Sequence, residues 1–522
     1  MTQQTIRIPW TASTEGRATV ASWQKAQAAV LRSAYANAEG RTAQELERFL
    51  KKRFPGHPLG SWAIHCATLD GIRLHHIKTD GKMVFGGRSN LLRRQKGLIS
   101  NDEWKALRQQ RAIEITGDRT RWGNRHFRLS ADGLTCGVEF LKHGVTLQLP
   151  EMSGKAGKLV RAVAKLAAAC EISVQFSLSR THLSITFDPM DLRKLPPNQT
   201  LEQVKIAEQG RMRRGRKRKD PDTHYAARRV KPIAHDERPV HPEWRPSINA
   251  HPHRAIGIDL NPQWIGLTVV EATDPADLTK VKVLDHRLLH IAVPQSSGSE
   301  NVQSIMANAA RLSISLARSW NAGLIVHEDG LGKLAWSKKN RPTTGLRTIN
   351  YWSRNAFLGC LARRARLSGL KLLPIWAGYS STIGNLSFDL PDGCAAAAEI
   401  ARRGLARASG IKELLPAVPP TVKLRLGKDG ELPDAIAQAI GDADSWQDVH
   451  RKIKSAQADR KVGVGYRRLH PTPQALGSGS FFLHGRSYAV DRLGKGKGAS
   501  CSARPVLTRT VQDSLDRVLV AT

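Results

Sequence analysis

The sequence predicts an α/β protein made of several domains. A chain of 522 residues is too long for one ordinary hydrophobic core, so two to four domains are expected. Three patterns follow one another along it. Helical spacing of apolar residues dominates residues 18–120, short alternating runs dominate 121–190, and strands alternate with helices after residue 254. A hydrophobic content of 40% is typical of a globular protein.

The first 120 residues predict a short edge strand and then helices. Residues 3–10 form the strand, which Pro9 ends, and helical spacing covers about 18–54 with a second helix from Thr42 to Lys52. Residues 85–112 interleave basic residues with apolar anchors, as on a helical surface that packs on one side and meets phosphates on the other. For any single arginine a solvated helix face is the better interpretation, but for the whole cluster we favour nucleic acid. The basic residues are Arg88, Arg93, Arg94, Lys96, Arg108 and Arg111.

Residues 121–190 predict a small β-rich domain that also takes up the N-terminal strand (residues 1–17). Five short alternating runs indicate strands, and one helix interrupts them. The strands are expected at 126–130, 135–140, 145–149, 173–178 and 183–187, and the helix at about 155–170.

The segment 191–253 is rich in proline, histidine and charge, and we expect a basic linker or arm because it buries too little apolar surface to fold alone. A phosphate backbone is its expected partner, although a nuclear-localisation signal has a similar composition. Its basic centre comprises Arg211, Arg213, Arg214, Arg216, Lys217, Arg218 and Lys219.

From residue 254 the order of elements is clearer. A hairpin of strands 255–260 and 265–271 turns at Asn261-Pro262, and a third strand follows at 281–293. Helices at 301–320, 349–367 and 393–405 then alternate with strands at 323–328 and 371–376. Three strands in a row followed by alternating helices and strands is the order of the RNase H-like fold, which we predict for residues 254–443. The basic region 444–522 is expected to bind RNA, to cover the cleft or to be disordered.

Three acidic residues fall at strand ends or helix starts, where a sheet presents side chains in one cleft. Asp259 is on the first strand, Glu328 ends the fourth strand and Asp392 precedes the last helix. Clustered carboxylates repel one another unless cations bind them, and hard oxygen ligands select Mg²⁺ or Mn²⁺. Two such ions activate a water and stabilise the leaving oxygen of a phosphodiester. Taken alone, Asp392 is better explained as an acidic residue that stabilises a helix N-terminus.

The net charge of +36 favours a polyanionic partner, with nucleic acid the first choice and an anionic membrane surface the second. No run approaches the roughly 18–20 apolar residues of a spanning helix, and Met1 to Trp10 lack the apolar core of a signal peptide. We therefore expect a soluble, intracellular protein. The six cysteines are far apart, which argues against disulfides and against a zinc ribbon built from cysteine pairs.

Four segments resemble the split RuvC nuclease motifs of TnpB-type transposon nucleases and of compact type V CRISPR effectors. They are Gly257–Leu260, Val326–Asp329, Ala377–Ser381 and Ala395–Gly404, and Phe85-Gly86-Gly87-Arg88 with its basic helix is similar to a further segment. The resemblance covers most of residues 1–410. It implies an RNA-guided DNA endonuclease, with β-rich wedge and helical recognition domains and with Asp259, Glu328 and Asp392 as metal ligands. The expected partners are then guide RNA and target DNA. The expected location is the cytoplasm of a prokaryote, at the nucleoid and not at a membrane.

Two departures from the family pattern bear on activity. The four-cysteine zinc ribbon is absent, since only Thr382 to Pro391 lie in its place, and zinc is not expected. The family's third aspartate usually stands seven residues before the Ile that corresponds to Ile400, which is Gly393 here, and Asp392 lies one residue further back. Asp389 and Asp434 are the other candidates. An RNA-guided DNA-binding protein with a weak or dead nuclease site, and a guide-free RNase H-like resolvase or transposase, are the alternative functions.

Overall fold

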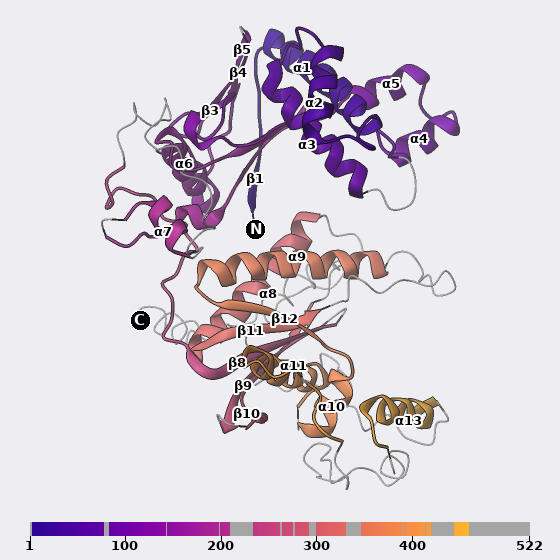
Figure 1. Ribbon diagram of the computed structural model, residues 1–522, viewed down its shortest axis with the longest axis vertical. Helices are drawn as coiled ribbons and strands as arrows, with labels where there is room; N and C mark the ends of the chain where they lie inside the picture. Colours follow the sequence, from indigo (N-terminus) through magenta and orange to yellow (C-terminus); the bar gives the residue numbers. More distant parts are fainter. Residues whose placement is uncertain are drawn as a thin grey trace, which may run out of the picture. The chain divides into compact units, whose positions relative to one another are not determined.

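The structure, a computed structural model, divides into two compact units, residues 1–244 and 245–522 (Figure 1). It describes residues 3–77, 83–141, 143–197, 199–208, 233–261, 264–274, 277–291, 299–329, 346–388, 390–412, 414–418 and 443–458.

Two antiparallel sheets form the β-rich part of the first unit. The four-stranded sheet has the order β1-β7-β6-β2, and the three-stranded sheet has the order β3-β4-β5. The N-terminal strand β1 pairs with β7 from Gln4↔Phe187 to Pro9↔His182, which confirms that it joins this region. The strands are β1 (Gln4–Pro9), β2 (Ile113–Ile115), β3 (Phe127–Leu129), β4 (Thr135–Phe140), β5 (His143–Gln148), β6 (Gln175–Leu178) and β7 (His182–Phe187).

The helices of the first unit begin where local signals place them. In both α2 and α5 the N-cap hydroxyl accepts from the backbone of a glutamate three residues on, and that glutamate bonds back to the cap, which is a capping box. The helix α3 lies in the region predicted to be helical, although the sequence analysis did not place an individual helix there. The helices are α1 (Thr14–Ala36), α2 (Ala43–Arg53), α3 (Gly60–Ile77), α4 (Arg88–Gln95), α5 (Asn101–Gln109), α6 (Gly154–Ala168) and α7 (Leu201–Glu208).

The segment expected to be a linker is packed at both of its ends, so that expectation was wrong there. Leu192, Leu195 and Leu201 belong to the core that α6 and the two sheets share. Further on, Arg238 and His241 are buried, and the Arg238 guanidinium contacts the carboxylate of Glu171. Burial of these leucines stabilises the packed segment. The prediction missed it because it used the average composition of the whole segment, which is polar.

A five-stranded sheet organises the second unit. Its order is β10-β9-β8-β11-β12, so the first strand of the unit lies in the centre. The strand β9 is antiparallel to β8 and β10, whereas β11 is parallel to β8 and β12. This is the strand order of the RNase H-like fold predicted from the sequence. The strands are β8 (His251–Leu260), β9 (Trp264–Asp274), β10 (Asp277–His290), β11 (Ala322–Asp329) and β12 (Lys371–Trp376).

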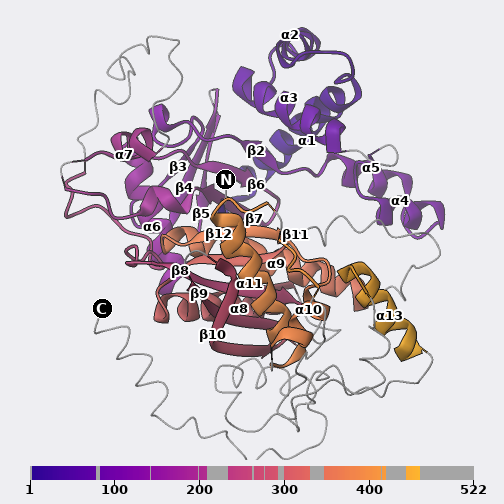
Figure 2. The same cartoon turned by 60° about the horizontal axis from the view of Figure 1, so that its bottom comes forward.

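Helices cover both faces of this sheet (Figures 1 and 2). Successive side chains of β8 point to opposite faces of the sheet, so they belong to two hydrophobic cores, one on each face. Ile256 and Ile258 pack on the side of α8 and α9, whereas Ala255 packs on the side of α11. The helices are α8 (Ser299–Ser319), α9 (Leu346–Leu367), α10 (Ser380–Ser387), α11 (Asp392–Ala408) and α13 (Trp446–Ala458).

The alanine-rich helix α11 lies against the β8–β9 hairpin at backbone contact distance. A Cβ at Gly257 would lie 1.8 Å from the carbonyl oxygen of Ala397, and a Cβ at Gly266 would lie 2.0 Å from that of Gly393. Glycine in the strands and alanine in the helix therefore permit the close approach that brings the start of α11 to the hairpin. Among the described helices, none combines the length and apolar content needed to cross a membrane.

Candidate active site

The site begins with two carboxylates on neighbouring parallel strands. In the register of β8 and β11, Ile258 lies opposite His327, so Asp259 and Glu328 follow side by side at the carboxyl ends of their strands. Side chains alternate between the faces, and Gly257, two residues before Asp259, faces α11. Both carboxylates therefore lie on the α11 face of the sheet.

The third carboxylate comes from the start of α11. This helix begins at Asp392, directly after the N-cap residue Pro391. The negative charge of Asp392 contributes to the raised pKa of Asp259, which brings Asp392 into the same electrostatic environment. Asp392, which is offset by one residue from the pattern of the similar family, is thus the first residue of the helix. At that position Asp392 also lies where a helix favours negative charge.

Two of the three carboxylates, those of Asp259 and Glu328, have raised pKa values. Burial, followed by the charges of Glu328 and Asp392, raises the pKa of Asp259 to about 8. Burial also raises the pKa of Glu328 to about 7, against the opposing influence of Arg354. The side chain of Asp259 is only 5% exposed. A bound cation would stabilise the ionised forms of both acids and so lower these pKa values.

Three polar side chains that sequence reasoning missed surround the carboxylates. The amide of Asn261 donates to Asp259, and the amide of Asn385, on α10, donates to Asp392. The guanidinium of Arg354, on α9, donates to the carbonyl of Leu260 and lowers the pKa of both Asp259 and Glu328. Two of these residues lie near features that the sequence shows. Asn261 belongs to the predicted hairpin turn, and Asn385 follows the Ala377–Ser381 motif. No local signal marks Arg354.

A buried ionic network fixes the segment that leads into α10. Glu399 accepts hydrogen bonds from Arg402 at 2.7 and 2.8 Å and from Arg403 at 2.7 Å. The guanidinium of Arg403 also donates to the carbonyls of Trp376 at 3.0 Å and Gly378 at 2.9 Å. Because all three charged side chains are buried, the network ties α11 to the Ala377–Ser381 motif and so to the helix that carries Asn385.

The donor chemistry of the cluster fits Mg²⁺ or Mn²⁺. The three carboxylates offer only oxygen, the ligand type that these ions prefer, and a bound cation would oppose the burial and the charge repulsion that raise the pKa of Asp259. As the side chains stand, no group of three His, Cys, Asp or Glu residues within the described ranges is close enough to hold one ion. Two of the carboxylates are instead engaged by Asn261 and Asn385.

The predicted phosphate-binding residues fall into two groups. Those on α4 and α5 and just beyond are exposed, except Arg111, which is half-buried and lies 3.9 Å from the carboxylate of Glu114. The structure places no buried residue on α4. The basic run Arg211–Lys219 and the alternative acids Asp389 and Asp434 lie outside the described residues.

Fold and site together define a mixed α/β protein with an RNase H-like sheet and a carboxylate cluster at the ends of its central strands. No protein-family model matches the sequence, and no curated protein matches it. Solved structures that are similar to it include RuvC of Thermus thermophilus in complex with a Holliday junction, with 16% identity and a TM-score of 0.22 over 30% of this chain and 97% of that chain. A second structure of this RuvC has 16% identity and a TM-score of 0.23 over the same shares. A Cas12f1–sgRNA–target DNA complex has 8% identity and a TM-score of 0.31, covering 76% of this chain and 98% of that one.

Proposed function

We propose that this protein is a divalent-metal-dependent DNA endonuclease of the RuvC type that uses a bound RNA to select its DNA target. The observation that carries the proposal is the grouping of Asp259, Glu328 and Asp392 at the ends of β8 and β11 and the start of α11. We place the protein in the cytoplasm of a prokaryote, where the nucleoid supplies the DNA.

In this proposal Asp259, Glu328 and Asp392 hold Mg²⁺ or Mn²⁺. When bound, the metal supplies an activated water and offsets the charge on the scissile phosphodiester. The protein's own groups prepare the site. Arg354 favours the ionised forms of Asp259 and Glu328, so the carboxylates are readier to accept a cation. Asn385 orients Asp392, and burial of Asp259 keeps bulk water from its carboxylate.

Nucleic-acid binding is assigned to the basic surfaces. The net charge of +36 and the exposed arginines of α4 suit a phosphate backbone, and the Arg211–Lys219 run is proposed as a second contact. The resemblance of the motifs to TnpB-type and type V proteins supports an RNA guide, whose base pairing then reads the DNA sequence.

Cleavage by the purified complex tests the proposal. The full-length protein is isolated with its bound RNA, the RNA is sequenced, and matching DNA is added with Mg²⁺ or with EDTA. We expect cutting that needs Mg²⁺ and matching DNA, and that Asp259→Ala abolishes while RNA binding stays intact. Loss of RNA binding in Asp259→Ala would contradict the division between site and binding surface.

One observation favours a second candidate, an RNA-guided DNA-binding protein with a weak or dead nuclease site. In the described residues no three acidic side chains stand close enough to share an ion, and Asp392 is engaged by Asn385. Tight binding of guide-matched DNA without cutting would support this candidate. Mg²⁺-dependent cutting by protein free of any discrete RNA would instead indicate a guide-free resolvase or transposase.

A further inference from the structure

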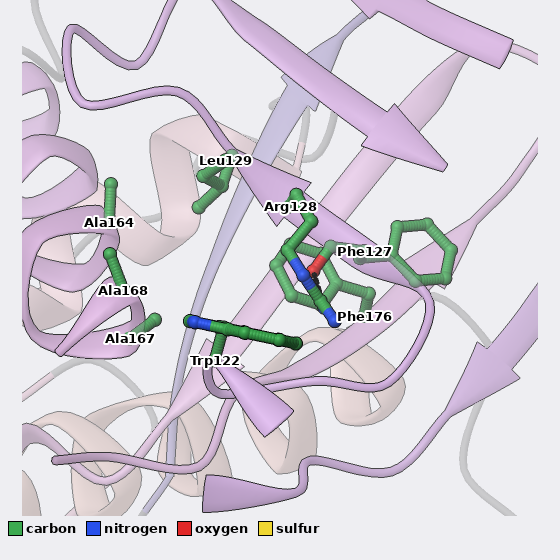
Figure 3. A pocket seen from close by; sticks show the side chains of 8 residues that line it. All are labelled: Trp122, Phe127, Arg128, Leu129, Ala164, Ala167, Ala168 and Phe176. Atoms are coloured by element: carbon green, nitrogen blue, oxygen red, sulfur yellow. Dashed lines mark hydrogen bonds between the residues drawn. The ribbon is translucent and has the colours of Figure 1, made fainter. Parts of the chain in front are cut away.

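The first unit holds an apolar pocket that its own residues line. It has a volume of about 210 Å³. Trp122 borders it below, the alanines of α6 border it on one side and Leu129 lies above, with Arg128 opposite the alanines (Figure 3). Phe127 and Phe176, stacked with ring centroids 4.8 Å apart, lie on the same side as Arg128 (Figure 3). The cavity exceeds the roughly 150 Å³ of an engineered apolar cavity that binds benzene, so one aromatic ring system fits.

Trp122 is held at this pocket in a conformation that a bulky side chain rarely adopts. Its φ is 55°, in the left-handed region, and the next residue, Gly123, has a φ of 80°. Trp122 nevertheless remains 38% exposed. Left-handed backbone at a large residue persists only where the surroundings impose it, and it is frequent at ligand sites. An exposed aromatic residue held in this conformation is typical of a ligand site.

The surroundings that impose this turn are buried hydrogen bonds. The amide of Asn124, which is fully buried, donates to the carbonyls of Ile115 at 3.3 Å, Thr116 at 3.1 Å and Val174 at 2.9 Å. The backbone of Asp118 donates to the carbonyl of Gly123 at 2.9 Å. These bonds anchor the turn to β2 and to the start of β6, so Trp122 is presented by a rigid frame.

Arg128 adds a positive charge to the aromatic surface. Its guanidinium carbon lies 4.8 Å from the centroid of the Trp122 ring, within the range of a cation–π contact. The guanidinium donates to the carbonyl of Phe127 at 2.9 Å and to that of Asn124, which holds it in place. Arg121 is exposed directly before Trp122. An aromatic face flanked by arginines suits a ligand that is itself aromatic and joined to an anion.

We propose that this pocket holds one unpaired base of a nucleic-acid strand, stacked on Trp122, with the adjoining phosphate near Arg121 and Arg128. The inference rests on the proposed function, because it supplies the strand, and it adds a contact that the basic surfaces do not provide. A stacked base is recognised through its ring, so the site tolerates different sequences.

Binding of short single strands tests the proposal. Fluorescein-labelled RNA and DNA of the same sequence are titrated with full-length protein in EDTA, and anisotropy is recorded. Trp122→Ala is expected to weaken binding about five- to one-hundred-fold, and Trp122→Phe to retain most of the affinity. Leu141→Ala is the matched control, because Leu141 is also an exposed apolar residue with positive φ, at 61% exposure and 52°, and it should bind normally. The strand whose affinity falls more in Trp122→Ala, RNA or DNA, is the occupant of the pocket.

An abasic strand separates stacking from phosphate contacts. Removing the bases should weaken binding of the strand to the wild type. The wild type and Trp122→Ala should then bind the abasic strand with equal affinity. Unchanged binding of Trp122→Ala and Trp122→Phe to the intact strands would overturn the proposal. If the wild type still cuts DNA in that case, the proposed function stands without the pocket. If the wild type never cuts but Trp122→Ala loses stacking, the pocket stands and the nuclease proposal fails.

Discussion

Asp259 and Glu328 lie side by side on parallel strands, one residue beyond the Ile258–His327 pair that joins β8 to β11. Neighbouring strands are about 4.8 Å apart, so two acids in adjacent register repel each other when both are ionised. Burial, and then the charges of Glu328 and Asp392, raise the pKa of Asp259. The arrangement is unfavourable for an empty site and favourable for one that binds a cation.

Asp259→Asn should stabilise the metal-free protein at alkaline pH. In the wild type the folded state keeps the proton of Asp259 up to a pKa of about 8, whereas an unfolded aspartate loses it near pH 3.9. The wild type therefore loses stability as pH rises between about 4 and 8, by at most about 1.4 kcal/mol per pH unit. Asparagine does not ionise, so the variant should melt higher than the wild type at pH 8 in EDTA, with little difference near pH 4.

The control for this prediction is Asp102→Asn, which removes a carboxylate with an 89% exposed side chain. It should leave the pH dependence of the melting temperature unchanged. Parallel melting curves of Asp259→Asn and the wild type across this pH range would show that Asp259 ionises normally. Mg²⁺ should raise the melting temperature of the wild type at pH 8, because it binds only the folded state, and should do so less in Asp259→Asn.

Asn385→Ala should reduce cleavage without preventing nucleic-acid binding. The Asn385 amide donates to Asp392, and removing a group that orients a metal ligand commonly costs about 10–100-fold in metal affinity or activity. The measurement is the cleavage rate as a function of Mg²⁺ concentration. Thr382→Ala, on the same helix, removes a 2.7 Å contact with His450 and should affect stability alone. Equal Mg²⁺ dependence in Asn385→Ala and the wild type would exclude the orienting role.

Arg354→Ala should move cleavage to higher pH. The guanidinium favours the ionised forms of Asp259 and Glu328, so without it both pKa values rise further and fewer carboxylates are ionised at neutral pH. The acidic limb of the pH–rate profile, measured at fixed Mg²⁺, is expected to shift upward. Arg366→Ala, an exposed arginine further along α9, is the matched control. A uniform loss of rate at every pH would instead assign Arg354 to positioning or to contact with DNA.

Features that depend on residues close together in the chain were predictable from the sequence. Contacts between residues far apart in the chain were not. Alternating residues and the Asn261-Pro262 turn are local, so the β8–β9 hairpin was predictable. Arg354 reaches the site from α9, on the opposite face of the sheet, and no spacing along the chain relates it to Asp259. The helix α10 is short and carries polar side chains on its buried side, Thr382 and Asn385 among them, so apolar periodicity does not reveal it.

Removing basic residues from α4 and its C-cap should lower the salt dependence of binding. Arg93 and Lys96 are exposed, and each phosphate contact contributes about 0.7–0.9 to the slope of log K against log salt. The double variant Arg93→Ala/Lys96→Ala should reduce the slope by about 1.4–1.8, measured by anisotropy at several salt concentrations. The control, Arg48→Ala/Lys52→Ala, removes the same charge from two exposed positions on α2. Equal slopes in both variants would show that net charge, and not the α4 surface, sets the affinity.

Gly257→Ala should destabilise the second unit and displace Asp392 together with α11. The added Cβ would lie 1.8 Å from the carbonyl oxygen of Ala397, so the helix must move away from β8, and overpacking of this kind typically costs about 1–3 kcal/mol. Chemical denaturation measures the cost, and the Mg²⁺ dependence of cleavage measures the displacement. In Gly359→Ala the new Cβ meets nothing within 4 Å, and alanine stabilises a helix interior by about 0.5–1 kcal/mol relative to glycine. If Gly257→Ala lost stability but kept normal Mg²⁺ dependence, Asp392 would not need the close packing of α11 to reach the metal site.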